Sequence, residues 1–471
     1  MANKPPNILW IYIEDQDPRY GCYGETLVET PNIDALAAEG VVFERAYSPA
    51  PVCSPSRSAV ITGSYAIRLG THVQRSSRFP GEEIYLPDGY KTVPEVFRDA
   101  GYFTFNNGKD DYNFARDRST LYTTGNDERE PDGKVGGGVS LQRGSGDWRE
   151  CPAGTPFFAQ IQTNGGKDGY SAEQASGVLQ RLGVEDPKLV SPDDVNVPPQ
   201  YPDILEMREM VANQLNTMLV SDILVGQMMM RLKADGHWGN TIVFLLSDHG
   251  ALFPRAKQMC YEEGLRVPLM AAAPGMPDFQ RLIPPGTRRR LPVATLDVGA
   301  TSLELAGITV PDYMDSANLF EGRQREHVFS ARDRCEWVVD RTRSAIGDRY
   351  HYIRNFMTDR PVAQPNFREA WPAVKRTREM YERGELTPTQ ALAYGPRPAE
   401  ELYDLKEDPH ETVNLADDPD HEEILKAMRA LVLAWIEDTD DKGQYPESKA
   451  ALAITKKQFR RWCTDPIFDD V

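Results

Sequence analysis

The stretch CSPSR, at residues 53–57, places a cysteine beside two serines, a proline and an arginine. Such a cysteine could be a small buried side chain, a disulfide partner, a thiolate nucleophile or a residue converted chemically after translation. The helical pattern SAVITG follows directly. We therefore expect Cys53 just ahead of a helix N-terminus, where backbone N–H groups and the helix dipole favour an anionic atom. Pro55 suits the first turn, and Ser54 suits the cap.

Acidic and imidazole side chains end two strand-like runs. Glu14 and Asp15 follow the apolar run NILWIYI. Asp248 and His249 follow TIVFLLS. Carboxylates from separate strand ends can converge at the rim of a parallel sheet, and hard divalent cations prefer several oxygen ligands, so these side chains are candidate ligands of one metal ion. For either pair alone, a solvated acidic turn is the alternative interpretation.

Three basic side chains extend this candidate site. Lys109 follows the strand-like run YFTFNNG, Lys257 comes nine residues after Asp248, and Arg57 ends CSPSR. Each lysine alone is typical of a protein surface. Placed in loops above the same sheet, the three would bind a tetrahedral anion beside the cation.

Alternating strand and helix patterns must position these residues. Strands are expected at residues 7–13, 41–47, 102–108, 156–163, 240–250 and 266–274. Helices are expected at residues 30–40, 58–63, 92–101 and 204–236. Apolar strands that alternate with amphipathic helices predict an α/β fold, with a large, mostly parallel sheet covered by helices on both faces. The polar, glycine-rich residues 115–152 suggest a long surface excursion.

The pattern changes after about residue 322. Short strand candidates follow one another without intervening helices, and one amphipathic helix comes late, at residues 422–438. This order predicts a small antiparallel sheet covered by a helix. We therefore divide the chain into a catalytic α/β domain, 1–322, and a C-terminal α+β subdomain, 323–471.

Composition excludes several classes of function. The 471 residues carry a formal charge of −18, which opposes binding to nucleic acid or to an anionic membrane. Six dispersed cysteines read as mostly free thiols and suggest no zinc site. No run of eighteen apolar residues predicts a membrane span. The N-terminus shows no signal peptide, so a cytoplasmic protein is expected unless a leader was trimmed.

The chain resembles the type I sulfatases, which are formylglycine-dependent members of the alkaline-phosphatase-like superfamily. Five marks occur in family order between residues 7 and 416: paired acids after the first strand, C-x-P-S-R followed by SAVITG, GYFTFNNGK, SDHG with K and YEEGLRVP after it, and ELYDLKEDPHETVNLA. In general look, the chain is closest to bacterial carbohydrate sulfatases and sulfamidase-like members. The resemblance implies an alkaline-phosphatase-like fold.

The resemblance also implies a mechanism. A formylglycine-generating enzyme would convert Cys53 to an aldehyde during maturation, and the aldehyde hydrate would attack sulfur to form a covalent sulfo-enzyme. The second geminal hydroxyl would then expel sulfate. Arg57 would hold the hydrate, and Lys109 and Lys257 would contact sulfate oxygens. The implied ligands of a Ca²⁺ ion, or alternatively Mg²⁺ or Mn²⁺, are Glu14, Asp15, Asp248, His249 and the modified Cys53.

Two departures from the family pattern concern histidines. Asp111, in GKDDYNF, stands where many members have a histidine that positions the nucleophile or substrate. The histidine that often follows the FFA-type strand is also missing, and the nearest candidates there are Thr163, Asn164 and Lys167. We propose His72 as the leaving-group acid or a sulfate ligand. A structural or surface histidine is the alternative.

Two arginines complete the predicted site. Arg332 and Arg334 alternate in RDRCEW and would share one strand face, where they could bind a polyanionic sugar. The alternative is an exposed charged face.

The sequence thus predicts a hydrolase of sulfate esters, or of N-sulfates, acting on a sulfated small molecule or saccharide. One alternative is a phosphonate monoester or phosphodiester hydrolase on the same scaffold. Another is a sulfated-glycan-binding relative with a degraded site. Self-association into a homo-oligomer stays open.

Overall fold

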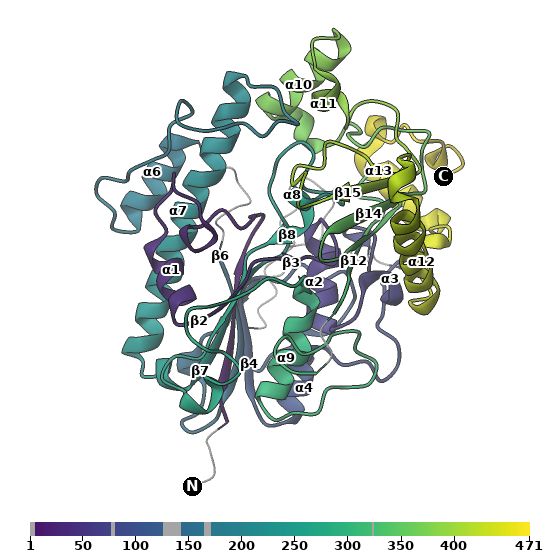
Figure 1. Ribbon diagram of the computed structural model, residues 1–471. Coiled ribbons are helices and arrows are strands. Elements are labelled where there is room, and N and C mark those ends of the chain that lie inside the picture. Colours follow the sequence, from purple (N-terminus) through teal and green to yellow (C-terminus); the bar gives the residue numbers. More distant parts are fainter. Residues whose placement is uncertain (1–4, 77–80, 126–142, 164–170, 323–324) are drawn as a thin grey trace.

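A large mixed sheet forms the centre of the molecule (Figure 1). The computed structural model describes residues 5–76, 81–125, 143–163, 171–322 and 325–471. Within them the strands of this sheet are β1 (Asn7–Ile13), β2 (Gly40–Phe43), β4 (Phe103–Lys109), β5 (Arg143–Ser145), β6 (Phe157–Thr163), β7 (Thr241–Ser247), β9 (Leu269–Ala272) and β10 (Thr287–Arg289). Their spatial order is β10-β2-β9-β7-β1-β6-β4-β5.

The strands at the centre of this sheet are parallel, as predicted. β1 pairs in parallel with both β6 and β7, and Ile13 lies opposite Ser247. This register brings the acids that follow each strand to one edge of the sheet. β9 instead runs antiparallel to β7. The one-turn helix α8 (Glu262–Leu265) and the two-residue strand β8 (Arg266–Val267) lie between them. Because neither is a crossover helix long enough to return the chain, β9 runs backwards.

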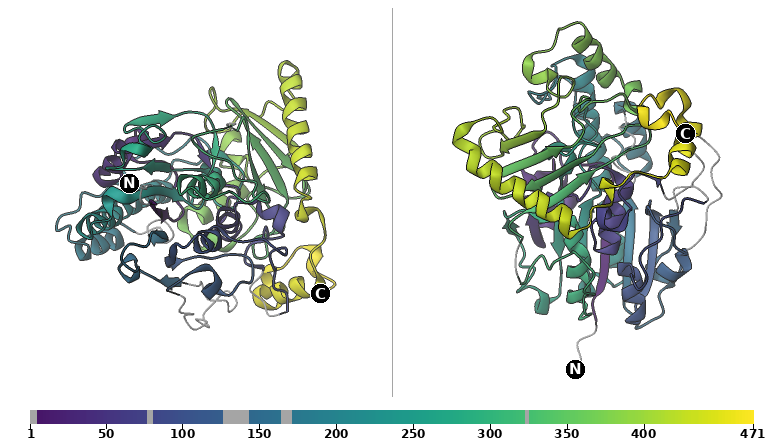
Figure 2. Two further views of the ribbon diagram at one scale, coloured as in Figure 1. Left: turned by 90° about the horizontal axis from the view of Figure 1, so that it is seen from below. Right: turned by 90° about the vertical axis from the view of Figure 1, so that its right-hand side faces the viewer.

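Helices cover both faces of the sheet (Figures 1 and 2). One face carries α1 (Pro31–Ala38), α6 (Ala172–Arg181) and α7 (Leu205–Ala234). The other carries α2 (Cys53–Thr62), α4 (Val93–Asp99) and α9 (Val298–Leu305).

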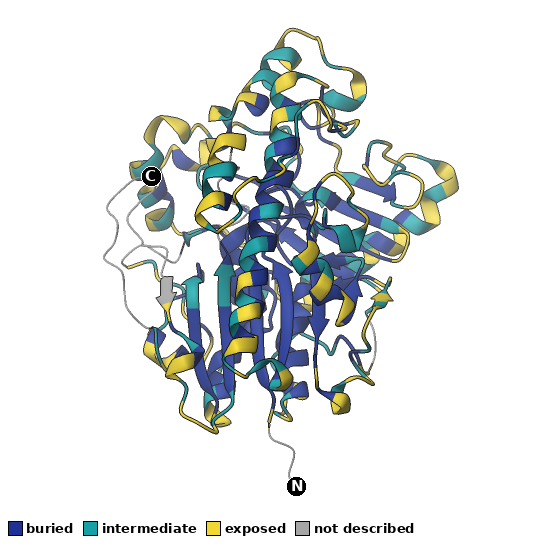
Figure 3. Cartoon of the chain, turned by 90° about the vertical axis from the view of Figure 1, so that its left-hand side faces the viewer, coloured by how far each residue is buried: buried dark blue, intermediate teal, exposed yellow. Residues whose placement is uncertain are grey.

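Residues of β1 alternate between the two cores. Leu9 and Ile11 join the core under α7, whereas Ile8 and Trp10 join the core under α2. Burial on both faces explains why the strand sequence is apolar throughout rather than alternating (Figure 3).

The C-terminal part forms the predicted antiparallel sheet. Its strands are β12 (Val328–Arg332), β13 (Thr342–Ile346), β14 (Tyr350–Asn355) and β15 (Glu400–Asp404). The late helix α12 (Glu422–Asp438) packs across it, with Leu425, Met428 and Val432 in the same core as strand residues Ala345 and Tyr352 (Figure 2).

Several details of this part differ from expectation. Helices α10 (Pro372–Glu382) and α11 (Pro388–Ala391) stand between β14 and β15, where no helix was predicted. Their sequence is strongly polar, which hid the helical pattern, because only one narrow stripe of α10 is buried. The change of sheet falls between α9 and β12. The division of the chain at 322/323 into two domains stays a prediction.

Smaller elements complete the fold. A three-stranded sheet is formed by β3 (Ala46–Tyr47), β8 (Arg266–Val267) and β11 (Val293–Ala294). The remaining helices are α3 (Ala66–Leu69), α5 (Arg118–Leu121) and α13 (Lys449–Phe459). Residues 126–142 of the expected 115–152 excursion lie outside the described residues, and the described parts on either side of them contain α5 and β5. None of the helices in the described part of the chain combines the length and apolar character that a membrane crossing requires.

Candidate active site

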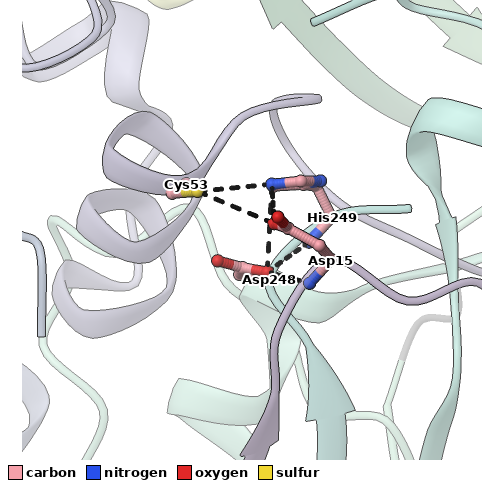
Figure 4. A group of neighbouring side chains, drawn as sticks. All are labelled: Asp15, Cys53, Asp248 and His249. Atoms are coloured by element: carbon pink, nitrogen blue, oxygen red, sulfur yellow. Dashed lines mark hydrogen bonds and ion pairs between the residues drawn. The ribbon is translucent and has the colours of Figure 1, made fainter. Parts of the chain in front are cut away.

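Four of the predicted metal ligands converge at the carboxyl edge of the central strands (Figure 4). Asp15 follows β1, Asp248 and His249 follow β7, and Cys53 begins α2. One potential ligand atom from each lies within 4.8 Å of the others. His249 Nε2 is 2.7 Å from Asp15 Oδ1 and 3.3 Å from Cys53 Sγ. All four side chains are buried. All four belong to the five metal-ligand candidates named from the sequence, and Glu14 is the fifth.

Backbone geometry aims the two aspartates. Asp15 has φ 57°, in the left-handed region that aspartate tolerates better than most residues. Its backbone N–H donates to Asp248 Oδ1 at 3.2 Å. The hydroxyls of Ser48 and Ser56 both donate to the backbone carbonyl of Asp248, at 2.7 and 2.5 Å. The sharp turn after β1 is thus tied directly to the end of β7.

Helix α2 begins two residues earlier than the expected Ser54 cap implies. Cys53 is itself the first helical residue and Val52 is the N-cap, so the prediction of Ser54 as cap was wrong. The Ser54 hydroxyl instead donates to the backbone carbonyl of Asp111 at 2.9 Å, and the Ser54 N–H donates to Gln74 Oε1 at 3.1 Å. A serine before a proline is typical of a helix N-cap, but the hydrogen-bonding groups of Ser54 are used in contacts with distant residues instead. Cys53 still lies at a helix N-terminus.

Arg57 lies one helical turn after Cys53, on the same side of α2. Its Nε donates to Asp248 Oδ2 at 2.8 Å, and its Nη1 donates to Gln162 Oε1 at 2.7 Å. The guanidinium also covers the Tyr12 ring, with its carbon 5.0 Å from the ring centroid. With these partners the guanidinium is held rigidly beside the cluster.

The two predicted lysines contact different acids at the site. Lys257 Nζ donates to Asp15 Oδ2 at 2.7 Å and lies 3.6 Å from Cys53 Sγ. Lys109 Nζ pairs with Glu14 and lies 3.3 Å from Asp111 Oδ2. Both lysines are buried, so neither is the surface residue that its type alone would suggest.

Glu14 and Asp111 therefore lie beside the cluster, and each is paired with the ammonium group of Lys109. Glu14 is not among the four convergent ligands, and its carboxylate oxygen is 3.8 Å from Arg57 Nη2 in addition to its pairing with Lys109. The metal-ligand role of Glu14 and the substrate role of Asp111 stay predictions.

Close packing of charges shifts the pKa values at the site. Burial raises the pKa of Asp15, but Lys257 and His249 outweigh it and hold that pKa well below its usual range. Burial lowers the pKa of His249, and the neighbouring Asp15 and Asp248 reverse this and raise it to about 10. Burial likewise raises the pKa of the Cys53 thiol, yet Lys109 and Lys257 bring it down to about 6. The site therefore favours an anionic atom at position 53.

Strained backbone concentrates around this cluster. Among the described residues, eight non-glycine residues have positive φ, and five of them are site residues: Asp15, Arg75, Asp111, Gln258 and Glu336. Each such residue costs about 1–3 kcal/mol, so the fold must over-determine them, as is common at functional sites.

The cluster opens into a cavity of about 220 Å³, called the inner cavity below. Besides Asp15, Cys53 and Lys257, its walls include four polar residues that the sequence analysis missed, Gln74, Arg75, Gln258 and Glu336. Positive φ is not visible in sequence, and none of these residues belongs to a recognisable motif. Of the alternative acids near residue 163, Thr163 donates a hydrogen bond to the Tyr12 carbonyl, whereas Asn164 and Lys167 lie outside the described residues.

The other three predicted residues have different surroundings. The pKa of His72 is lowered by burial, and the charges that act on it belong to C-terminal residues, foremost Asp333 and Arg343. Strand β12 ends at Arg332, so Arg332 and Arg334 do not share a strand face. Both are buried, which excludes the exposed charged face as well.

The two arginines also have different partners. Arg332 pairs with Asp340 at 3.0 Å, and Arg334 pairs with Glu447 at 2.6 Å. Their roles in substrate binding, and that of His72 as an acid, stay predictions.

Comparison with known proteins bears on this geometry. A family model described as Sulfatase matches residues 6–308, more than half of the chain. The chain belongs to the sulfatase family. This sulfatase is 28% identical over 502 aligned residues to an ulvan-active sulfatase of Formosa agariphila, covering 99% of this chain and 80% of that protein. It is 25% identical to human N-sulphoglucosamine sulphohydrolase, covering 93% of this chain and 91% of that protein.

A solved structure titled a 2-O GAG sulfatase superposes with a TM-score of 0.63 and 21% identity, over 94% of each chain. The predicted alkaline-phosphatase-like fold is thereby confirmed. The protein is a sulfuric ester hydrolase. Members of its family generally use a metal ion and formylglycine, and the buried Asp15, Cys53, Asp248 and His249 form a donor set that suits such an ion.

Proposed function

We propose that this sulfatase removes sulfate from a sulfated carbohydrate, with Cys53 converted to formylglycine and with Ca²⁺ as the metal. The convergence of Asp15, Asp248 and His249 on Cys53 is the observation that carries the proposal. Its relatives support a sulfated carbohydrate as the substrate class, because they include an ulvan-active sulfatase and an N-sulphoglucosamine sulphohydrolase.

The balance of buried charge supports a divalent cation together with a singly charged anion. Seven ionisable residues at the site are buried: the acids Glu14, Asp15, Asp111 and Asp248 and the bases Arg57, Lys109 and Lys257. With His249 neutral as a ligand, the acids exceed the bases by one charge. A divalent cation turns this into an excess of one positive charge. A sulfate monoester, which carries one negative charge, then makes the buried site neutral.

The donor set supports Ca²⁺ first. The carboxylates of Asp15 and Asp248 are hard oxygen ligands, and Glu14, which lies beside the same Lys109 as Asp248 does, is the proposed third. The imidazole nitrogen of His249 keeps Mg²⁺ and Mn²⁺ as alternatives. When bound, a divalent cation favours the deprotonated form of a neighbouring hydroxyl.

The chain's own residues supply the remaining functions in this proposal. The N-terminus of α2 and Lys257 stabilise negative charge on the oxygen that replaces the Cys53 sulfur. Lys257 and Lys109 can donate to sulfate oxygens from two sides. Arg57 holds Asp248 and Gln162 in place, so that the ligands do not reorganise during turnover. Neither alternative function, phosphonate or phosphodiester hydrolysis or binding without catalysis, is better supported.

Two measurements on one preparation test the proposal. The protein is co-produced with a formylglycine-generating enzyme, and mass spectrometry of the peptide that contains Cys53 should find an aldehyde in place of the thiol. The same protein should release sulfate from ulvan oligosaccharides or from N-sulphoglucosamine, and the two substrates separate ester from N-sulfate cleavage. The Cys53→Ala variant is the control and should be inactive but folded. A converted enzyme that hydrolyses aryl phosphonate monoesters and no sulfated sugar would overturn the proposal.

A further inference from the structure

A second, larger cavity adjoins the inner cavity. It has a volume of about 620 Å³ and is called the outer cleft below. The two cavities share three wall residues, Arg75, Glu336 and Phe367. The outer cleft therefore borders the inner cavity, which contains Cys53, along these three residues. The remaining walls of the outer cleft are Trp337, Gln458, Phe459, Arg460, Arg461 and Trp462.

Aromatic rings form much of the outer cleft. Trp337 stacks on Trp462 with centroids 5.6 Å apart, and Phe459 lies 4.9 Å from Trp337. The indole N–H of Trp337 donates to the Pro365 carbonyl at 3.1 Å, which fixes that ring. Phe367 and Trp462 nevertheless stay 39% and 45% exposed. Large open rings on an otherwise acidic protein offer flat apolar faces to a ligand, and the C–H face of a sugar ring is such a partner.

The outer cleft is also cationic. Arg75, Arg460 and Arg461 face one carboxylate, Glu336, whereas the whole chain carries a charge of −18. Arg75 has φ 60° and Arg460 has φ 44°, so two of these arginines lie on strained backbone. The Nε atom of Arg75 has no hydrogen-bond acceptor among the described residues, although Asp111 Oδ1 is 3.9 Å away. This combination selects a ligand that is both ring-shaped and anionic.

We propose that the outer cleft binds the sugar residue next to the sulfated one in an anionic oligosaccharide. That sugar stacks on Trp462 and Phe367, and its carboxylate or sulfate pairs with Arg75 and the Arg460–Arg461 pair. The proposal rests on the proposed function, since the sulfated residue must occupy the inner cavity. It makes the segment after α12 a determinant of substrate length, although this segment lies outside the region that the family model matches.

A purely structural role for the rings predicts something different. If Phe459 and Trp462 only attach α13 to the rest of the molecule, replacing them lowers the melting temperature and changes the kcat/KM for all substrates by the same factor. If they bind sugar, replacement acts on long substrates alone. The preference for long substrates therefore distinguishes the two roles.

The first experiment measures that preference. The kcat/KM for a sulfated ulvan tetrasaccharide is divided by the kcat/KM for 4-nitrophenyl sulfate, which has no neighbouring sugar. We expect Trp462→Ala and Phe367→Ala each to lower this ratio about tenfold, the effect of losing one stacking contact. Trp462→Tyr should restore most of it. Tyr445→Ala removes another exposed C-terminal aromatic ring outside the cleft and should leave the ratio unchanged.

The second experiment measures binding without turnover. Calorimetry on the Cys53→Ala protein compares the tetrasaccharide with a sulfated monosaccharide, and we expect the longer ligand to bind about tenfold more tightly in a salt-dependent way. Arg460→Gln together with Arg461→Gln should remove that salt dependence. Equal affinity for the two ligands, or a ratio unchanged in both aromatic variants, would overturn the inference. Absence of all turnover, with length-dependent binding retained, would instead overturn only the proposed function.

Discussion

Replacing Lys257 with methionine removes one charge from the centre of the site and keeps the length of the side chain. Lys257 Nζ donates to Asp15 Oδ2 at 2.7 Å, and the lysine and aspartate side chains are 9% and 1% exposed. Breaking a buried pair by removing one partner costs about 3–5 kcal/mol, because the other charge stays buried and uncompensated. We expect the metal-free variant to lose about this much stability.

A bound cation should reverse part of that loss. Ca²⁺ beside Asp15 supplies the positive charge that Lys257 supplied, so the variant should gain more stability from Ca²⁺ than the wild type does. Catalysis should not recover in the same way. One charge-assisted hydrogen bond to a sulfate oxygen is worth about 1.5–3 kcal/mol, which corresponds to a loss of roughly 10- to 150-fold in kcat/KM.

The assay combines thermal unfolding in EDTA and in Ca²⁺ with initial rates on 4-nitrophenyl sulfate. Lys257→Arg keeps the charge and should lie between wild type and Lys257→Met in both measurements. Lys188→Met changes an exposed lysine and should behave as wild type. The reasoning would be refuted if Lys257→Met hydrolysed 4-nitrophenyl sulfate in Ca²⁺ at the wild-type rate and its melting temperature in EDTA equalled that of the wild type.

Three further predictions concern the nucleophile, the metal and the histidine. Cys53→Ser should lose at least about 10³-fold in kcat, because a serine cannot become the aldehyde on this maturation route. Its circular dichroism spectrum should match that of the wild type. Turnover near the wild-type rate would contradict the prediction. EDTA should abolish hydrolysis and Ca²⁺ should restore it, whereas Asp15→Asn should need a higher Ca²⁺ concentration for half-maximal rate, measured by titration. If His72 is the leaving-group acid, His72→Gln should lower kcat/KM about 10²–10⁴-fold, and a change of less than about twofold would assign it a structural role instead. Burial lowers the pKa of His72 below 6.5, so the folded protein binds a proton at this histidine less readily than the unfolded chain does. The wild type should therefore lose stability as the pH falls through 6.5. Denaturant unfolding should show a smaller loss for His72→Gln.

Local patterns were enough to predict most of the elements around the site. The apolar run at β1 and the Thr92/Glu95 capping box at α4 specify their own structures, because each depends on neighbours in sequence. Polar α10 was missed for the opposite reason, since its helical stripe is narrow. The reversed direction of β9 was also missed, because strand direction depends on how the chain returns across the sheet.

The sequence by itself determined the chemistry of the site: a convertible cysteine in C-x-P-S-R, acids and a histidine at two strand ends, and basic residues after them. These features are local, so they could be recognised without coordinates. Tertiary structure alone decided which of them meet, since the register of β1 against β7 brings residues more than 200 positions apart within 4.8 Å. It also decided which residues line the two cavities, from Arg75 and Glu336 to Trp462. Those residues carry no shared motif, and only the tertiary fold brings the segment after α12 beside Arg75, Glu336 and Trp337 to form one surface.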